Sequence, residues 1–297
     1  MADVLVDDRP TPAVPPRAAP PRRPSARQLE RRSRVVRYAL RIVVVVYLIM
    51  LVGWPLSLVA QRALGNGLDD IKELFADPQM MHAFKLTLFA ALISVAINTV
   101  FGITISILLV RYEFPGKRLL NAFVDLPLAV SPIVVGLSLV LVYNSRSGWF
   151  GPALEGAGFR VMYAFPAIVM ATTFVALPLV IREVVPVLQE VGTDQEQAAR
   201  SLGANAFQRF RRITLPSIKW AVIYGMVLTL ARSLGEFGAV KVVSGNVLGV
   251  TRTATLAVEE KYLNFDKPGA YATAFLLALV SVACIIVVSL LRPKDQG

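Results

Sequence analysis

The sequence predicts an all-α membrane protein with six transmembrane helices. Hydrophobic residues make up 55% of its 297 residues and the mean hydropathy is +0.59, whereas soluble domains are about 45–50% apolar. A helix needs about 20 apolar residues to cross the hydrocarbon core of a bilayer. Six segments of suitable length occur in order along the chain, at 38–60, 84–110, 122–143, 164–181, 218–243 and 270–291.

The basic residues are distributed unevenly over the segments that separate these spans. With the N-terminus in the cytoplasm, 21 of the 31 lie in cytoplasmic segments, 8 lie on the opposite side, and the remaining two lie in the fifth span. Cytoplasmic loops carry an excess of Lys and Arg, so we expect both termini to be cytoplasmic. The net charge of +11 therefore does not indicate nucleic-acid binding, and no basic groove with interleaved aromatic residues accompanies it.

The first span follows a segment, residues 1–37, that is rich in Pro and Arg. Such a composition cannot bury enough apolar surface to fold, so we expect this segment to be disordered and cytoplasmic. It is too long for the basic region of a signal peptide and no clean cleavage site follows it, so we expect the first span to be retained. The transmembrane domain then covers residues 38–291, and a cytoplasmic tail covers 292–297.

Prolines interrupt the third and fourth spans. Pro127 and Pro132 lie in the third, and Pro166 and Pro178 lie in the fourth. Broken backbone is tolerated at membrane depth where neighbouring helices or a water-lined cavity satisfy its polar groups. The prolines therefore indicate either a bundle around a translocation path or structural kinks in an inert bundle.

A charged segment between the fourth and fifth spans is predicted to form two short helices at an angle. Thr193 and Glu196 have the spacing of a capping box, which starts a helix. Gly203 is the kind of residue that ends a helix in the left-handed conformation. Asn205 can cap a second short helix, and Pro216 bounds it.

The same segment carries small residues at the predicted joint, and small side chains let the backbone of a partner approach closely. Their spacing resembles the cytoplasmic coupling loop of binding-protein-dependent ABC importer permeases, which reads Glu-Ala-Ala, three residues, Gly, nine residues, Ile-x-Leu-Pro. The positions that match are Ala198, Ala199, Gly203, Ile213, Leu215 and Pro216.

The resemblance implies that the loop of about residues 183–217 docks onto a separate ATP-binding cassette subunit. Gln197 occupies the position of the family's Glu, with Glu196 one residue earlier. Gln keeps the length and the hydrogen bonding of Glu but carries no charge. The residues that the resemblance assigns to the ATPase contact are Glu196, Gln197, Ala198, Ala199, Gly203, Ile213, Leu215 and Pro216. Apart from the resemblance, the segment could be an ordinary polar loop between membrane helices.

Two charged residues, Arg232 and Glu236, lie within the fifth span. They are four residues apart and share a helix face. Charges inside a span are costly and face a partner or a wet cavity, while Gly235 and Gly238 beside them permit close packing. The pair either holds the bundle together or lines an anion path in which Arg232 offers positive potential.

The region of residues 232–246, with 256–260 further on, resembles sulfate-type permeases. The resemblance runs from about residue 80 to 291, and the Val-Val-Ser-Gly sequence at 242–245 is similar to the second of the two sister permeases of sulfate/thiosulfate importers. It implies a bacterial plasma-membrane protein that works with a sister six-span permease, two copies of an ATP-binding cassette subunit and an extracytoplasmic binding protein. Molybdate and tungstate permeases are similar enough to remain alternatives.

The sequence contains no Gly-x-x-x-x-Gly-Lys-Ser/Thr loop that would cradle ATP phosphates and no catalytic triad, so we expect no enzyme activity. One Cys (Cys284) and one His (His82) cannot build a metal cluster, and we expect no cofactor. An ion-coupled secondary transporter is the alternative of a different class, but Glu236 is the only acidic residue well inside a span, Asp125 lies near the edge of one, and no internal repeat is visible. A membrane scaffold that transports nothing would not need the coupling loop.

Overall fold

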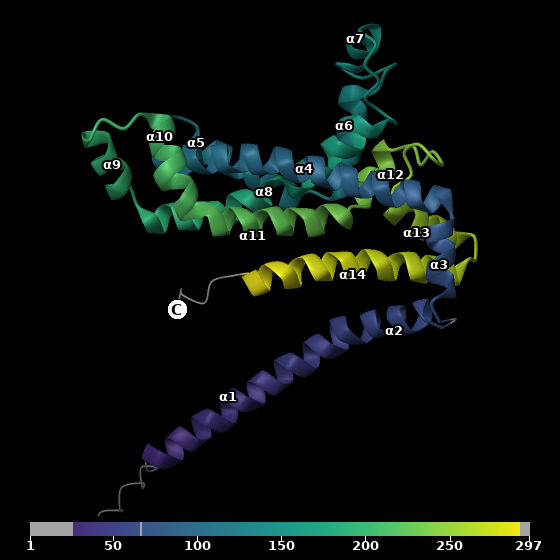
Figure 1. The fold of residues 1–297 in the computed structure, drawn as a ribbon, viewed down its shortest axis with the longest axis horizontal. Helices are drawn as coiled ribbons and strands as arrows, with labels where there is room; N and C mark the ends of the chain where they lie inside the picture. Colours follow the sequence, from purple (N-terminus) through teal and green to yellow (C-terminus); the bar gives the residue numbers. More distant parts are fainter. Residues whose placement is uncertain (1–25, 66, 292–297) are drawn as a thin grey trace, which may run out of the picture. The chain divides into compact units, whose positions relative to one another are not determined.

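The computed structural model describes residues 26–65 and 67–291, and every element in these ranges is a helix (Figure 1). The chain divides into two compact units, Met1–Pro55 and Leu56–Gly297. The coupling loop and the intramembrane ion pair both belong to the second unit.

The first unit contains α1 (Ala26–Leu48), the π-helix η1 (Ile49–Gly53) and the first residues of α2 (Trp54–Ala63). Of the segment that we expected to be disordered, residues 1–25 lie outside the described residues and residues 26–37 are helical. The sequence explains this start, since it has no proline between Pro24 and Pro55 and the residues that follow Ala26 are mostly Arg, Leu, Gln and Glu, which favour helix.

The second unit contains the rest of α2 and all later elements. In chain order these are α3 (Asp69–Ala76), α4 (Pro78–Arg111), α5 (Lys117–Ala129), α6 (Pro132–Tyr143), α7 (Gly151–Gly156), α8 (Phe165–Val191), α9 (Asp194–Ser201), α10 (Ala206–Arg209), η2 (a π-helix, Phe210–Thr214), α11 (Leu215–Leu234), α12 (Gly238–Val243), α13 (Ala254–Leu263) and α14 (Lys267–Leu291).

Five helical stretches in the described part of the chain are long and apolar enough to cross a bilayer, and a sixth crossing is available if a bent pair counts as one span. The bent pair consists of α5 and α6, whose axes differ by 113°. The other five candidates are Val36–Ala63, Pro78–Arg111, Phe165–Val191, Ala206–Leu234 and Lys267–Ile286.

The packing of α4 against α8 shows that the bent pair makes one crossing. Arg111, the last residue of α4, donates hydrogen bonds to the carbonyls of Leu188 (3.1 Å) and Gly192 (2.6 Å) at the end of α8. Near the other ends of these helices, the rings of Phe89 and Phe165 are 6.3 Å apart. The two helices are therefore parallel, so the chain between them must return across the membrane once, through α5 and α6.

The third predicted span, 122–143, is interrupted at Pro132, as predicted, but not at Pro127, which lies inside α5. It breaks between Ala129 and Pro132, and Ser131 has extended backbone (φ −60°, ψ 135°). Proline disfavours helical backbone at the residue before it, so Pro132 ends one helix and, at the first turn, suits the start of the next.

The predicted ends of the fourth and fifth spans also differ from the structure. The fourth span was expected to end at residue 181, but α8 continues to Val191, because helix formation does not stop where the sequence becomes charged. The fifth span was expected to run from 218 to 243, but α11 ends at Leu234 and α12 begins at Gly238. Gly235 and Gly238 weaken the helix here, and the Glu236 side chain accepts a backbone hydrogen bond at the break.

The core of the second unit is centred on the contact of α4, α8 and α11, and Val180 of α8 is fully buried in it. Gly102 of α4 and Gly225 of α11 both approach this residue. An added Cβ would lie 2.8 Å from the Val180 side chain at Gly102 and 2.9 Å from the Val180 Cα at Gly225. Small residues allow such close helix packing in membranes, and this packing fixes the positions of the helix ends that carry the coupling loop.

Candidate coupling loop and intramembrane ion pair

The coupling loop begins where α8 ends, and its first helix is not held by the predicted capping box. The Thr193 side chain makes no cap hydrogen bond to the backbone of α9; it accepts a hydrogen bond from the Gln197 side chain (2.8 Å). Glu196 instead forms an ion pair with Arg111 (3.1 Å). The guanidinium adds charge–charge attraction to the hydrogen bond, which a backbone N–H does not offer, and Glu196 turns toward α4.

Arg111 connects three elements. Besides its bonds to the end of α8, its guanidinium donates through Nε (3.3 Å) and Nη2 (3.1 Å) to the Glu196 carboxylate on α9. Thr214 of η2 donates its hydroxyl to the same carboxylate oxygen (3.0 Å). The Arg111 side chain is only 10% exposed. These contacts, which we call the Arg111 junction, fix α9 against the ends of α4 and α8 and the start of α11.

The Arg111 junction was not predicted from the sequence. Arg111 was counted only as one of the basic residues that set the orientation. The available signal was a single Arg directly at the end of a long apolar run, but no sequence spacing places it beside Glu196, 85 residues later.

The joint between α9 and α10 has the predicted form. Gly203 has a left-handed backbone (φ +85°), and the Ala204 N–H bonds to the Ala199 carbonyl (3.0 Å). Asn205 caps α10, and its side chain and that of Gln208 form a reciprocal capping box (2.8 and 3.0 Å).

We expected Pro216 to bound a separate second short helix, and this prediction was wrong. Pro216 lies in the first turn of α11, and α10, η2 and α11 run on as one stretch, Ala206–Leu234. Proline has no N–H for the carbonyl one turn earlier. The wider π turn just before it, in which the Leu215 N–H bonds to the Phe210 carbonyl, is a local adjustment of the kind found as bulges at functional sites.

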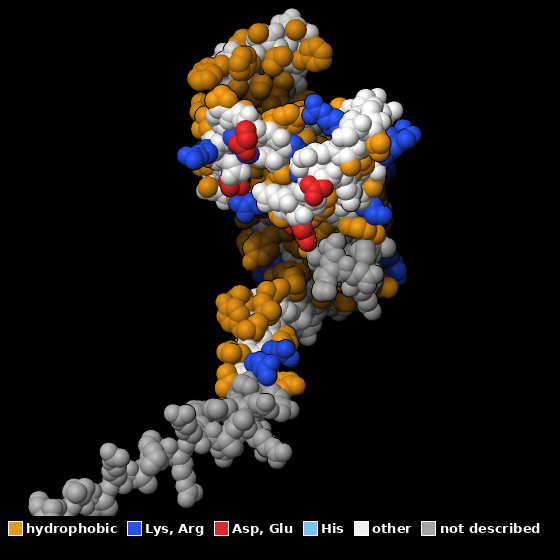
Figure 2. Space-filling view, turned by 90° about the vertical axis from the view of Figure 1, so that its left-hand side faces the viewer, with side chains coloured by type: hydrophobic (Ala, Val, Ile, Leu, Met, Phe, Trp, Pro, Cys, Tyr) orange, Lys and Arg blue, Asp and Glu red, His pale blue; other side chains and the backbone are white. Residues whose placement is uncertain are grey.

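The coupling loop projects from one end of the second unit (Figure 1). Figure 2 views that end, where positive, negative and apolar side chains are interspersed. Two large apolar side chains of the loop are more than half exposed, Leu202 (89%) and Phe207 (67%). Neither was among the predicted contact residues. Of those, Gln197, Ala198, Gly203 and Pro216 are exposed, whereas Glu196, Ala199, Ile213 and Leu215 are half-buried.

The intramembrane pair forms as the helical spacing predicts, with Arg232 Nη1 2.8 Å from Glu236 Oε2. The Glu236 side chain is only 2% exposed. Its other oxygen accepts the N–H of Ala239 in α12 (2.9 Å), and its backbone carbonyl accepts the hydroxyl of Thr255 in α13 (2.9 Å). Glu236 therefore joins the end of α11 to the starts of α12 and α13, a structural arrangement that neutralises Arg232.

The basic residues that follow along the chain are paired in the same way. In residues 232–266, all of which the structure describes, each basic residue forms an ion pair with an acidic one. The pairs are Arg232–Glu236, Lys241–Glu259, Arg252–Glu260 and Lys261–Asp266. This segment thus presents no unneutralised cation to an anion path.

Asp266, in the loop before α14, shows how these pairs stabilise the connections between helices. Burial by itself would raise the pKa of this carboxyl, but the hydrogen bond from Lys261 (2.8 Å), the Gly269 N–H (3.0 Å) and the Lys261 charge together hold the pKa below its usual value. The same carboxylate thus caps α14 and anchors α13.

The sequence matches the family described as "Binding-protein-dependent transport system inner membrane component" over residues 98–294. It is 46% identical over 240 residues to "Sulfate transport system permease protein CysW" of Synechococcus elongatus, covering 81% of this chain and 84% of that protein. It is 42% identical to CysW of Escherichia coli K12 (80% and 81% covered) and 35% identical to the "Sulfate transport system permease protein CysT" of the same organism (81% and 86% covered).

The fold is similar to that of a solved chain from a "bacterial ABC transporter involved in the import of the acidic polysaccharide alginate". The TM-score is 0.72 at 17% identity, with 91% of this chain and 100% of that chain covered. A second structure, with a TM-score of 0.72 and 17% identity, shows such a transporter "in complex with alginate pentasaccharide-bound periplasmic protein" and covers 90% of this chain and 97% of that chain.

Proposed function

Because this chain belongs to the family of binding-protein-dependent transport system inner membrane components, we propose that it is a permease subunit of an ATP-driven importer of sulfate or thiosulfate. The relatives described above are all named for sulfate transport. The higher identity to CysW than to CysT agrees with the resemblance to the second sulfate permease.

The observation that carries the proposal is the exposed α9–α10 joint, fixed to the transmembrane helices through the Arg111 junction. A docking loop must present a surface to its partner and must also transmit the partner's movement. Leu202 and Phe207 supply exposed apolar contacts, and the Arg111–Glu196 pair links α9 to α4 and α8. A movement of a bound ATPase would reach the membrane-spanning helices through these contacts.

The partners follow from the same premise. ATP hydrolysis is assigned to two copies of a separate ATP-binding cassette subunit. Substrate capture is assigned to an extracytoplasmic binding protein, by analogy with the alginate transporter and its periplasmic protein. Escherichia coli has two sulfate permease proteins that are both similar to this chain, which supports a sister permease as a further component. The N- and C-termini are assigned to the cytoplasm by the distribution of basic residues.

An ion-coupled mechanism has less support. It would need a carboxylate at membrane depth that is available to a coupling ion. Within the part of the chain that the structure describes, Glu236 is bound by Arg232 and the α12 backbone, and Asp125 pairs with Arg182 at 3.0 Å.

The test is uptake of labelled sulfate by a bacterial strain that lacks its own sulfate permeases, with this chain expressed beside its ATPase, sister permease and binding protein. We expect uptake that requires ATP and is lost when this chain is omitted. Uptake of molybdate but not sulfate under the same conditions would contradict the substrate assignment, and uptake that persists without the ATPase would contradict the mechanism.

A further inference from the structure

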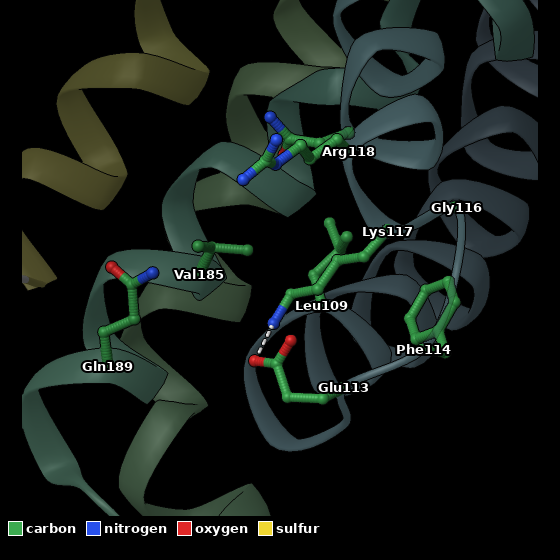
Figure 3. A pocket seen from close by; sticks show the side chains of 9 residues that line it. Leu109, Glu113, Phe114, Gly116, Lys117, Arg118, Val185 and Gln189 are labelled. Atoms are coloured by element: carbon green, nitrogen blue, oxygen red, sulfur yellow. Dashed lines mark hydrogen bonds and ion pairs between the residues drawn. The ribbon is translucent and has the colours of Figure 1, made fainter.

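A cavity of about 650 Å³ lies beside the Arg111 junction, between the end of α4, the start of α5 and the end of α8 (Figure 3). Polar side chains of three elements line it: Glu113 in the α4–α5 turn, Lys117, Arg118 and Asn121 on α5, and Gln189 on α8. Arg118, Asn121 and Gln189 offer N–H donors, and Lys117 offers a fourth. Neither the Arg111 junction nor the Arg232–Glu236 pair uses these donors.

The charge in this cavity differs from that of the paired segment at 232–266. Arg118 has no hydrogen bond or ion pair with any residue that the structure describes. Lys117 is paired with Glu113 at 2.7 Å, but the Glu113 side chain is 89% exposed, and such exposed pairs contribute little. The cavity thus holds one free guanidinium and one ammonium that can exchange its partner at small cost.

The side-chain amides of Asn121 and Gln189 add further hydrogen-bond donors beside Arg118. Asn121 lies one turn along α5 from Lys117 and Arg118, and Gln189 faces them from α8 in Figure 3. In the described part of the chain neither amide has a hydrogen-bond partner. Guanidinium, ammonium and amide N–H groups together suit the oxygens of sulfate or phosphate groups.

We propose that this cavity is a binding site for a tetrahedral oxyanion on the coupling-loop side of the protein. Its volume lies within the range of ligand pockets, about 300–1,000 Å³, and is many times that of a water molecule. It therefore has room for a hydrated sulfate ion or for a phosphate group attached to a larger molecule, such as an anionic lipid. The chemistry that Arg118 recognises is the same for both sources.

The position of the cavity links it to the coupling loop. Leu109 and Glu113 line it and lie two residues before and after Arg111, and Gln189 follows Leu188, whose carbonyl Arg111 binds. The site therefore shares its walls with the Arg111 junction. If the chain is an importer, as proposed above, this is the side on which the transported anion is released, but binding in the cavity does not depend on transport.

The experiment measures access to the cavity in the assembled transporter, held in lipid nanodiscs without the binding protein. Val185 lines the cavity and donates no side-chain hydrogen bond, so Val185→Cys in a Cys284→Ser background places this chain's only thiol at the site. The rate of labelling by a neutral maleimide is then followed as sulfate is added to nanodiscs of a neutral lipid, with chloride at equal ionic strength as reference. A second series replaces part of the neutral lipid by phosphatidylglycerol, without sulfate.

We expect slower labelling with sulfate, with phosphatidylglycerol, or with both, which identifies the source of the oxyanion. Arg118→Gln should raise the concentration needed by about tenfold, the equivalent of one charge-assisted hydrogen bond, and Arg118→Lys should preserve most of the effect. Lys219→Gln removes an exposed charge on α11 outside the cavity and should change nothing. The proposal would be overturned if neither sulfate nor phosphatidylglycerol slows the labelling. It would also be overturned if they slow the labelling of Arg118→Gln as much as that of the protein that retains Arg118. Either result would count even if sulfate uptake is normal.

Discussion

Arg111 donates to acceptors on α8 and α9, so its loss should loosen the coupling loop rather than the transmembrane core. Arg111→Met leaves Glu196 without its guanidinium and frees two carbonyls. Hydrogen bonds to charged groups contribute about 1.5–3 kcal/mol each. We expect the permease to insert normally but to co-purify poorly with its ATPase, and uptake to fall in parallel.

Glu196→Gln provides the matched control, because its amide can still accept from Thr214 and Arg111. It should weaken ATPase association less than Arg111→Met does. Normal ATPase co-purification with Arg111→Met would show that the joint docks independently of the Arg111 junction.

Arg232 and Glu236 allow a direct test of structure against pathway. Removing one partner of a buried pair costs about 3–5 kcal/mol, and Glu236 is almost fully buried. Because Glu236 is also bound to α12, we expect Arg232→Met to lower the yield of folded protein and Arg232→Met with Glu236→Leu to recover part of it. If uptake is lost in Arg232→Met while the yield is normal, and the double variant restores nothing, Arg232 contacts the anion.

At the scale of elements, the left-handed Gly203 is the critical position of the α9–α10 joint. Gly203→Val places a β-branched residue at φ +85°, a conformation that such residues resist, although a Cβ there would contact nothing within 4 Å. The defect should therefore be conformational. We expect transport and substrate-stimulated ATP hydrolysis to fall together while the subunit still inserts.

Gly203→Asn is the suitable comparison, since Asn tolerates the left-handed conformation, and it should retain most of the activity. Wild-type uptake and coupled ATP hydrolysis in Gly203→Val would contradict the assignment of this joint to ATPase docking.

The connection between α13 and α14 should respond to pH through Asp266. The folded protein lowers the pKa of this carboxyl, so its contribution is complete above the pKa of the unfolded chain and disappears as the pH falls through the lower, folded pKa. Asp266→Asn should remove that dependence, because the amide oxygen can still cap α14 but cannot form the ion pair with Lys261. Thermal unfolding measured between neutral and acid pH, for both proteins, checks this; equal pH dependence would contradict it.

Most of the elements could be predicted from the sequence, and the exceptions have common physical causes. Apolar length locates spans well, and Gly203 and Asn205 mark local conformations that depend only on nearby residues. Pro132 marked the interruption between α5 and α6, but the 113° angle between these helices and the break after α11 were hidden because hydropathy continues across both. The Arg111 junction was hidden because it joins residues that are far apart in sequence, and the Thr193 cap failed for the same reason, since Glu196 had a stronger distant partner.

At the scale of the whole second unit, the packing of α4, α8 and α11 around Val180 can be tested directly. Gly102→Ala brings a Cβ within 2.8 Å of the Val180 side chain, whereas Gly225→Ala brings one within 2.9 Å of its Cα. Overpacking of this kind costs about 1–3 kcal/mol. We expect both variants to lower the temperature at which the detergent-solubilised protein unfolds.

A second substitution at Val180 should reduce the stability cost of Gly102→Ala but not that of Gly225→Ala. Val180→Gly removes both atoms, Cβ and Cγ1, that obstruct Gly102→Ala, so Gly102→Ala should cost less stability in a Val180→Gly background than in the wild type. The cost of Gly225→Ala should not fall in the same way, because the Val180 Cα that obstructs it remains. Gly156→Ala, at a helical position with nothing within 4 Å, serves as the control and should be neutral. Rescue of both variants to the same extent would mean that the α8–α11 contact is more adaptable than the structure indicates.

The one-to-one pairing of charges in residues 232–266 has a consequence for how an anion reaches this region. A net positive funnel would draw anions from a distance, and added salt would screen that attraction within about 8–10 Å. With every cation there already compensated, this segment exerts little long-range attraction. The entry of the substrate should then depend on its transfer from a docked binding protein. The uptake rate should change little with ionic strength once the binding protein is saturated with substrate.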